Sequence, residues 1–365
     1  MALVLTVIFV ALAFEFINGF HDTANSIATV VSTKVLTPRQ AILLAAFTNL
    51  LGALWGTAVA KTISSGLIDS KLVSVTSGVI VCALIGAILW NLITWWLGLP
   101  SSSSHALIGG LCGSALAASG NNLEVIVWAQ PNSQHWWLGK GLLWKVIVPM
   151  VTSPVAGLVL GFCFMALLYL ILQNSRPLKV NRFFAVAQIF SAGGMGLMHG
   201  TNDAQKTMGI IALTLFAATK AGQLHDLPGW LSFLYTPQPA DGRDVGIALW
   251  IKVTCALTMA AGTAVGGWRI IRTLGHKMVK LHPINGFAAE ASSAAVIAVA
   301  TQLGIPVSTT HNISAAIMGV GAAKRLNAIR WTIVKRILWA WIFTIPVSAG
   351  LGYVFERVSV SLSGH

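Results

Sequence analysis

Two acidic motifs interrupt otherwise apolar stretches of this 365-residue chain. Residues 19–26 read GFHDTANS and residues 200–207 read GTNDAQKT, so that Asp22 aligns with Asp203. A carboxylate surrounded by hydrocarbon costs about 3 kcal/mol or more unless something offsets its charge. We expect a bound cation, a proton or a basic neighbour such as Lys206 to do so. The alternative is an Asp–Lys pair that only fixes helix packing.

A second pair of motifs carries hydroxyl groups. Residues 98–105 read GLPSSSSH and residues 304–311 read GIPVSTTH, and an apolar run follows each motif. Pro suits the first turn of a helix, and Ser or Thr suits its N-cap. Two such helix starts meeting near the membrane midplane would surround a tetrahedral oxyanion with free N–H groups and hydroxyls. The alternative is that these hydroxyls only bond the preceding turn of their own helices.

Four further ionisable residues lie in apolar segments, and the sequence does not decide their roles. His105 and His311 follow the hydroxyls, where they either contact the anion, relay a proton or are satisfied buried histidines. Glu15 and Glu290 are either proton carriers or hydrogen-bond donors that hold packed helices together. No spacing of metal ligands on one helix face is evident, so we predict no metal site and no catalytic residue.

The composition indicates where these motifs lie. Of the residues, 56% are apolar and only 9% are charged, whereas soluble domains carry roughly 25% charged residues. The net charge of +13 would suggest nucleic acid in a soluble protein, but here the basic residues occupy short connections between apolar runs. We expect a polytopic protein embedded in the lipid bilayer, with no nucleic-acid partner.

Ten apolar segments of roughly membrane-spanning length follow one another. They lie near 2–33, 39–60, 73–98, 100–118 and 142–173, and then near 183–218, 246–268, 284–303, 305–323 and 332–356. Both motif pairs recur in the same order in the two series. The predicted fold is an all-α polytopic membrane protein with two inverted-topology repeats of about five transmembrane or re-entrant segments each, with broken helices. The repeats are expected to cover residues 1–182 and 183–365.

The basic residues predict the orientation of the chain. The connections 34–39, 176–182, 269–280 and 324–336 hold 14 of the 23 Lys and Arg residues and no Asp or Glu. The positive-inside rule places these connections in the cytoplasm and both chain ends outside. Each half then makes five crossings, although a re-entrant hairpin is able to replace some of them. The second half enters the membrane upside down relative to the first.

The electrostatics of such a site favour symport. Two carboxylates beside an oxyanion such as phosphate would repel it. Loading the carboxylates with protons, Na⁺ or a divalent metal removes that repulsion, so cation and anion bind cooperatively. No GxxxxGK[ST] motif occurs, which disfavours direct ATP drive.

The motifs resemble the repeated GANDVANA signature of the inorganic phosphate transporter (PiT) family, and most closely its bacterial low-affinity Pit-type permeases. The resemblance covers essentially the whole chain, including GLPSSSSH and GIPVSTTH. It implies cation-coupled import of inorganic phosphate through the bacterial inner membrane, with no cofactor and with a homodimer as the expected assembly. The substrate-binding residues that it implies are Asn25, Ser103, Ser104, Gln205, Lys206, Thr309 and Thr310, and the cation-coupling residues are His21, Asp22, Asn202 and Asp203.

One departure bears on the coupling ion. His21 stands where sodium-coupled relatives usually carry Asn, and imidazole is a poor Na⁺ ligand but a good proton site. We therefore favour proton coupling over Na⁺, and leave open that phosphate enters as a complex with a divalent metal. Sulfate or another tetrahedral oxyanion is the nearest alternative substrate. An intramembrane metal-dependent hydrolase using His21, Asp22 and His199 is a remote alternative, and a passive channel is another.

Overall fold

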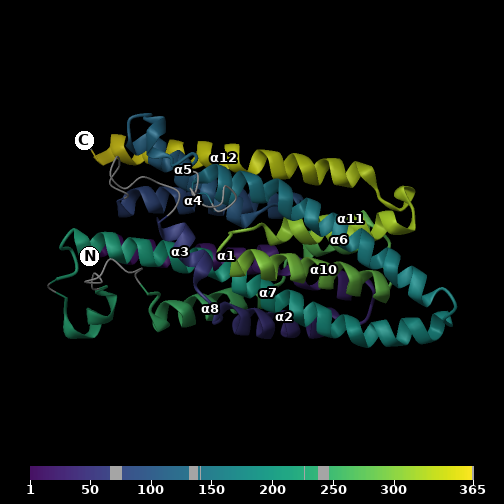
Figure 1. Cartoon of the computed structure of the whole chain (residues 1–365). Coiled ribbons are helices and arrows are strands. Elements are labelled where there is room, and N and C mark those ends of the chain that lie inside the picture. Colours follow the sequence, from purple (N-terminus) through teal and green to yellow (C-terminus); the bar gives the residue numbers. More distant parts are fainter. Residues whose placement is uncertain (66–75, 131–138, 140, 226, 237–245, 364–365) are drawn as a thin grey trace.

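The computed structural model describes residues 1–65, 76–130, 139, 141–225, 227–236 and 246–363. The regular elements of these residues are all helices, which confirms the predicted all-α class (Figure 1). In chain order the α-helices are α1 (Ala2–Ser32), α2 (Pro38–Ala53), α3 (Ala58–Ser65), α4 (Ser77–Leu97), α5 (Ser103–Ala118), α6 (Val148–Leu172), α7 (Pro177–Lys220), α8 (Leu249–Val265), α9 (Trp268–Arg272), α10 (Pro283–Gln302), α11 (Thr309–Lys324) and α12 (Trp331–Ser363). Short 3-10 or π segments are η1 (Leu123–Val125), η3 (Leu143–Ile147), η4 (Gly229–Leu234), η5 (Thr273–Met278) and η6 (Leu326–Ala328).

Some of the ten predicted segments are broken helices instead of full crossings. The segment predicted at 39–60 divides into α2 and α3, and the chain bends by 59° between α8 and the helical turn 268–278. In the described part of the chain, α1, α4, α6 with η3, α10 and α12 are each long and apolar enough to cross a membrane, and the bent pair makes a sixth candidate. The 16-residue helices α5 and α11 rise only about 24 Å, which is less than the ~30 Å hydrocarbon core.

The two hydroxyl motifs adopt the same local structure in both halves. Gly98 and Gly304 follow α4 and α10 with left-handed backbone angles, φ = 65° and 64°, which glycine adopts without strain. Ser102 and Ser308 then cap α5 and α11, and each side chain accepts a 3.2 Å hydrogen bond from the backbone N–H three residues on. These matched breaks confirm that the sequence repeat is a structural repeat.

The helices of the two halves interlock. The helix α1 packs on α8, α2 on α7, α5 on α12 and α6 on α11, so each pair joins one helix from each half. The signature glycines allow two of these contacts, because a Cβ at Gly19 would lie 2.4 Å from the Met259 carbonyl oxygen and one at Gly200 would lie 2.3 Å from that of Asn49. Among the described residues, both apolar clusters therefore contain side chains from both halves.

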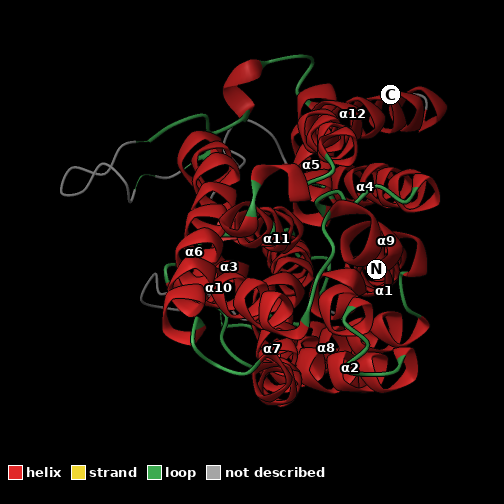
Figure 2. Ribbon diagram, turned by 90° about the vertical axis from the view of Figure 1, so that its right-hand side faces the viewer, coloured by secondary structure: helices red, strands yellow, loops and turns green. Residues whose placement is uncertain are grey.

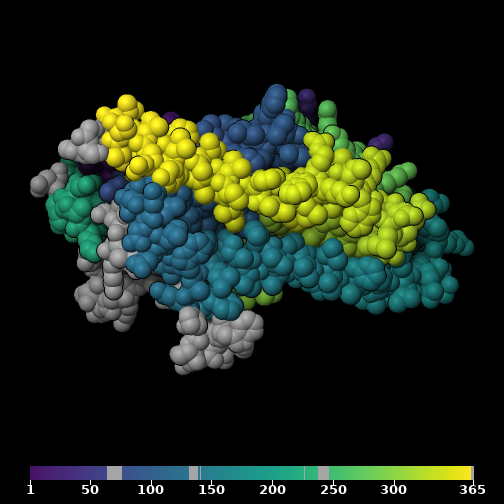
Figure 3. Space-filling model, turned by 90° about the horizontal axis from the view of Figure 1, so that it is seen from above, coloured from purple at the N-terminus to yellow at the C-terminus, as the bar shows by residue number. Residues whose placement is uncertain are grey.

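Polar residues separate two apolar clusters along the bundle. One cluster includes Val4 and Phe14 near the start of α1, and the other includes Ile27 and Val30 near its end. The outer surface is also apolar, since large side chains such as that of Phe190 are exposed. Figure 2 shows the helices nearly end-on, and Figure 3 shows α12, in yellow, running along one face of the molecule. This distribution is that of a multi-pass membrane protein with a polar layer inside it.

Both chain ends lie at the same end of the bundle. Figure 1 shows the N-terminus of α1 and the C-terminus of α12 there, and the connections 33–37, 173–176 and 325–330 at the opposite end. The separation agrees with the prediction that the basic connections share one side of the membrane. Which side faces the cytoplasm stays a prediction.

Candidate functional site

The two hydroxyl-rich helix starts meet in the middle of the molecule. The helices α5 and α11 begin within the polar layer, and the ring centroids of His105 and His311 are 4.9 Å apart. Both acidic motifs lie in the middle of long helices, α1 and α7, and Asp22 and Asp203 are buried. The predicted meeting of the two motif pairs is thus confirmed.

Asp22 is paired with histidine. Its Oδ1 lies 2.7 Å from Nδ1 of His21 and accepts a 3.3 Å hydrogen bond from the Thr310 hydroxyl. Nε2 of His21 lies 3.1 Å from the Thr94 hydroxyl. Among the described residues, no Lys or Arg lies within ion-pair distance of Asp22. Among the described residues, the basic side chains near Asp22 are therefore the histidines His21 and His199.

Asp203 has a lysine beside it. Lys206, one turn along α7, forms an ion pair with its Oδ1. Nε2 of His199 lies 3.0 Å from Oδ2 of Asp203, but the angle between the two groups does not suit a hydrogen bond. The Thr309 hydroxyl donates a 3.0 Å hydrogen bond to the same oxygen. The basic neighbour anticipated from the sequence is therefore present for Asp203.

Lys206 also joins the two halves. Its ammonium group donates to the hydroxyl of Ser104, at the start of α5, and to the carbonyl oxygen of Val307, 3.1 Å away, just before α11. A buried ammonium needs such acceptors to offset the loss of water. Lys206 thus lies between both hydroxyl motifs, where an anion would meet a positive charge.

Asn25 completes a continuous network. Its amide Nδ2 donates to the Thr309 hydroxyl at 3.1 Å and to the Thr310 hydroxyl at 2.9 Å. Because these hydroxyls donate in turn to Asp203 and Asp22, one chain of hydrogen bonds links the two carboxylates. A change of charge at one carboxylate is therefore able to affect the other through Asn25 and the two threonine hydroxyls.

Three other predicted site residues lie outside this network. The Ser103 hydroxyl and the Asn202 Oδ1 are buried and have no hydrogen-bond partner among the described residues. The amide group of Asn202 donates to Thr301 at 2.9 Å. Gln205 Oε1 accepts a 2.8 Å hydrogen bond from the Val59 N–H, so this side chain holds the start of α3. Ser103 and Asn202 thus keep a free polar atom for a ligand, whereas Gln205 is engaged in the fold.

The structure adds His199 to the acidic pair. One ligand atom from each of Asp22, His199 and Asp203 lies within 4.8 Å of the others. These atoms are close enough to share a proton or a metal ion. No metal site was predicted from the sequence, because no spacing of ligands on one helix face was recognised. The four-residue step from His199 to Asp203 is such a spacing, and the fold brings Asp22 to them from α1.

Two other buried acids, Glu290 and Glu15, bond to neighbouring helices. Glu290 on α10 accepts hydrogen bonds from Thr29 on α1 and from Ser191 on α7. Glu15 on α1 accepts one from Thr207 on α7. Both carboxyls are fully buried and contact hydroxyl donors. These contacts agree with the packing role that the sequence had left open beside proton carriage.

Comparison with known proteins places the chain in a family. The sequence profile described as "Phosphate transporter family" matches twice, over residues 18–180 and 172–352. The chain is 45% identical to a probable low-affinity inorganic phosphate transporter of Bacillus subtilis (strain 168), over 96% of both sequences. It is also 45% identical to a protein of that description from Rhizobium meliloti (strain 1021), over 95% of this chain and 93% of the relative.

A solved structure has the same fold. The chain matches a structure titled "The sodium-dependent phosphate transporter" with a TM-score of 0.79, over 98% of this chain and 99% of that one. The identity is only 23%, so this likeness concerns the fold alone. The repeated profile match and the near full-length relatives, which are named as transporters and not as enzymes, agree with the paired motifs. The chain belongs to the phosphate transporter family.

Proposed function

We propose that this protein imports inorganic phosphate by symport with a proton. The observation that carries the proposal is the chain of hydrogen bonds from Asp22 through Thr310, Asn25 and Thr309 to Asp203. It joins two buried carboxylates to groups that suit an oxyanion. An anion entering here is repelled until the carboxylates are neutralised, so substrate and cation bind together.

Phosphate suits this site better than sulfate. At neutral pH phosphate carries protons that it is able to donate, whereas sulfate carries none. Asp22 and Asp203 are acceptors for such protons, and Lys206, Asn25 and Ser103 are donors for the remaining oxygens. The relatives from Bacillus subtilis and Rhizobium meliloti are described as phosphate transporters, which supports the same substrate.

The contacts of His21 support a proton as the coupling ion. His21 lies 2.7 Å from Asp22, so the two groups are able to share a proton within the membrane interior. An imidazole is a weak ligand for Na⁺, which prefers oxygen. The divalent alternative, in which a metal ion enters with phosphate, would use the atoms of Asp22, His199 and Asp203.

The proposed orientation follows from the positive charges. We place the basic connections in the cytoplasm and both chain ends outside, in the inner membrane of a bacterium. A homodimer is the proposed assembly, on the resemblance to the family.

Uptake into proteoliposomes tests this function. Purified protein is reconstituted, and uptake of radiolabelled phosphate is measured with pH, Na⁺ and Mg²⁺ gradients imposed one at a time. We expect accumulation with an acidic exterior and loss of accumulation with an uncoupler, which a passive channel would not show. Accumulation that follows Na⁺ and ignores the pH gradient would show that the coupling ion is wrong. Sulfate that competes as well as unlabelled phosphate would show that the substrate is wrong.

The variant His21→Asn tests whether His21 is needed for coupling to protons. Asn provides a neutral amide oxygen and no titratable group, so we expect the pH gradient to lose most of its effect on uptake. Phosphate exchange between equal concentrations should continue. His225→Asn, which alters an exposed histidine after α7 outside both the site and its helix starts, is the matched control. If His21→Asn keeps the full response to the pH gradient, the role of His21 is contradicted.

A further inference from the structure

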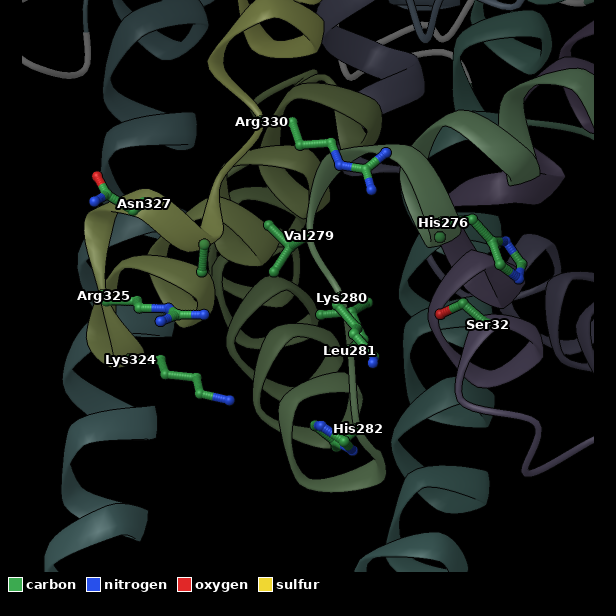
Figure 4. A pocket seen from close by; sticks show the side chains of 12 residues that line it. Ser32, His276, Val279, Lys280, Leu281, His282, Lys324, Arg325, Asn327 and Arg330 are labelled. Carbon is green, nitrogen blue, oxygen red and sulfur yellow. The ribbon is translucent and has the colours of Figure 1, made fainter.

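A basic cavity opens at the end of the bundle opposite the chain ends. Its volume is about 510 Å³, within the ~300–1,000 Å³ typical of small-molecule sites. Figure 4 shows side chains from the end of α1, from η5 and the stretch before α10, and from the turn between α11 and α12. Its lining residues are Ser32, Gly275, His276, Val279, Lys280, Leu281, His282, Lys324, Arg325, Asn327, Ala328 and Arg330.

The lining of this cavity, which we call the basic cavity, carries a large excess of positive charge. Lys280, Lys324, Arg325 and Arg330 line it, and none of its lining residues is acidic. Of the ion pairs that the structure describes, none involves these four side chains. Their charges therefore repel one another unless an anion binds between them.

The positive-inside rule accounts for basic residues here, but not for their arrangement around a hollow. Gly275, Val279 and Leu281 are buried, whereas the four charged side chains that line the basic cavity with them are exposed. A hollow with a buried apolar lining and four cations around it concentrates positive potential on an anion, which scattered surface lysines do not.

The charge and the volume indicate which anion would fit. One phosphate group carries about −1.5 to −2 at neutral pH, so four fixed positive charges balance roughly two such groups. We propose that the basic cavity binds a ligand with two or more phosphate groups, at a site separate from the transport site. Such a ligand is either a soluble polyphosphate compound or the headgroup of a diphosphorylated lipid, since basic pockets at the cytoplasmic ends of membrane helices suit both.

The position of the basic cavity connects it to the transport site through one helix. Lys324 ends α11, whose first residues, Thr309 and Thr310, contact Asn25 and the two carboxylates. The helix is 16 residues long, so the two sites are about 24 Å apart along it. A ligand that holds the end of α11 against the stretch before α10 would restrain the helix that carries these hydroxyls. We expect it to change the rate of transport without touching transported phosphate.

Binding of a defined probe tests the proposal directly. Delipidated protein is titrated with sodium tripolyphosphate by isothermal calorimetry, and inorganic phosphate at equal ionic strength serves as the competitor. The triple variant Lys280→Gln/Lys324→Gln/Arg330→Gln should weaken binding by roughly 100-fold, since each cation contributes about a factor of five. The matched control is Lys277→Gln/Lys335→Gln/Arg336→Gln, three exposed basic residues that do not line the basic cavity. The control should bind tripolyphosphate within about threefold of the unaltered protein, because distant exposed charges are screened.

A second arm distinguishes the two sources of phosphate groups. Protein purified without delipidation is analysed by native mass spectrometry for bound cardiolipin. A lipid ligand predicts cardiolipin on the unaltered protein and the control but not on the triple variant. If the ligand is soluble, the triple variant should bind tripolyphosphate more weakly than the control variant does. The amount of bound cardiolipin should then be the same in all three proteins. If the triple variant fails to fold, Lys324→Gln/Arg325→Gln, at an exposed helix end, replaces it.

Three results would overturn the proposal. The first is that neither tripolyphosphate nor cardiolipin binds the unaltered protein. The second is that the control variant loses as much affinity as the triple variant, which would mean that net charge alone attracts the probe. The third is that inorganic phosphate competes as well as tripolyphosphate, which would mean that the site takes a single phosphate group.

Discussion

The two carboxylates of the repeat occupy equivalent positions but have different neighbours. Asp203 has a lysine, Lys206, at ion-pair distance, whereas among the described residues the basic side chain at that distance from Asp22 is the histidine His21. In the aligned motifs the position of Lys206 is taken by Asn25 in the first half. The basic partner of the carboxylate is therefore a lysine in one half of the site and a histidine of the neighbouring position in the other half.

This difference suggests a division of work between the halves. Lys206 pairs with Asp203 and also donates to Ser104, where an anion would bind. Under the proposed function, the proton that couples transport would bind at the Asp22–His21 pair. Inverted repeats bring matched backbones together, and small sequence differences at matched positions then give each half its own chemistry.

The largest expected effect is on stability, from Asp203→Asn. The variant leaves Lys206 buried and cationic without its carboxylate, and breaking such a pair typically costs about 3–5 kcal/mol in free energy of unfolding. Thermal unfolding of the purified protein in detergent would show a clear fall in melting temperature. The double variant Asp203→Asn/Lys206→Met should recover most of that fall, yet still fail to accumulate phosphate. A single variant that melts like the unaltered protein would contradict the importance of this ion pair.

Next in size is the effect of Asp22→Asn on coupling. Asn keeps the shape of the side chain but takes no proton, so we expect concentrative uptake to fall by ~100-fold, in the upper range of coupling free energies. The melting temperature should change little, because no buried lysine loses its partner. Asp22→Glu, which retains a carboxyl group, is the control and should retain part of the uptake. Equal destabilisation by Asp22→Asn and Asp203→Asn would remove the contrast between the two halves.

The parts of the fold that depend on residues close together in the sequence could be predicted. Composition identified a membrane protein, and the motifs GLPSSSSH and GIPVSTTH located the starts of α5 and α11, because Gly, Pro and Ser act within a few residues. The break between α2 and α3 was not predicted. There the chain is apolar on both sides, and the contacts that hold the start of α3 come from Gln205, about 150 residues away.

The sequence indicated which residues belong to the candidate site, but not which of them contact one another. Asp22, Asp203, Lys206 and the hydroxyls stood out because polar groups are costly in hydrocarbon. The approach of His199 to both carboxylates depends on the packing of α1 against α7, which no spacing within one helix reveals. Gln205 was assigned to substrate by its place in the motif, although its side chain bonds the backbone of α3.

Gln205→Ala should therefore lower the stability of the fold and leave the binding of phosphate unchanged. Loss of its side chain leaves the Val59 N–H without its acceptor, and an unsatisfied buried group costs about 1–3 kcal/mol. We expect a lower melting temperature with little change in the KM for phosphate. Gln205→Met, of similar volume, separates lost packing from lost hydrogen bonding. A large rise in KM at unchanged stability would restore Gln205 to the substrate site.

The smallest effect concerns two matched hydroxyls, Ser103 and Thr309. The Thr309 hydroxyl is engaged with Asn25 and Asp203, whereas the Ser103 hydroxyl is buried without a partner among the described residues. A free buried hydroxyl costs free energy unless a ligand satisfies it, so Ser103→Ala should leave stability unchanged and raise the KM for phosphate by ~10-fold. Thr309→Val should lower stability as well, because it also breaks the hydrogen-bond chain between the carboxylates.

The control for this pair is Ser114→Ala on the same helix as Ser103. The Ser114 hydroxyl is buried too, but it donates a 2.9 Å hydrogen bond to the carbonyl oxygen of Gly110 and so has no bond to offer phosphate. KM values for all three variants come from initial rates of radiolabelled phosphate uptake in proteoliposomes. If Ser103→Ala and Ser114→Ala give the same KM, the Ser103 hydroxyl does not contact phosphate. The anion would then be held by Lys206 and by the other hydroxyls of the two motifs.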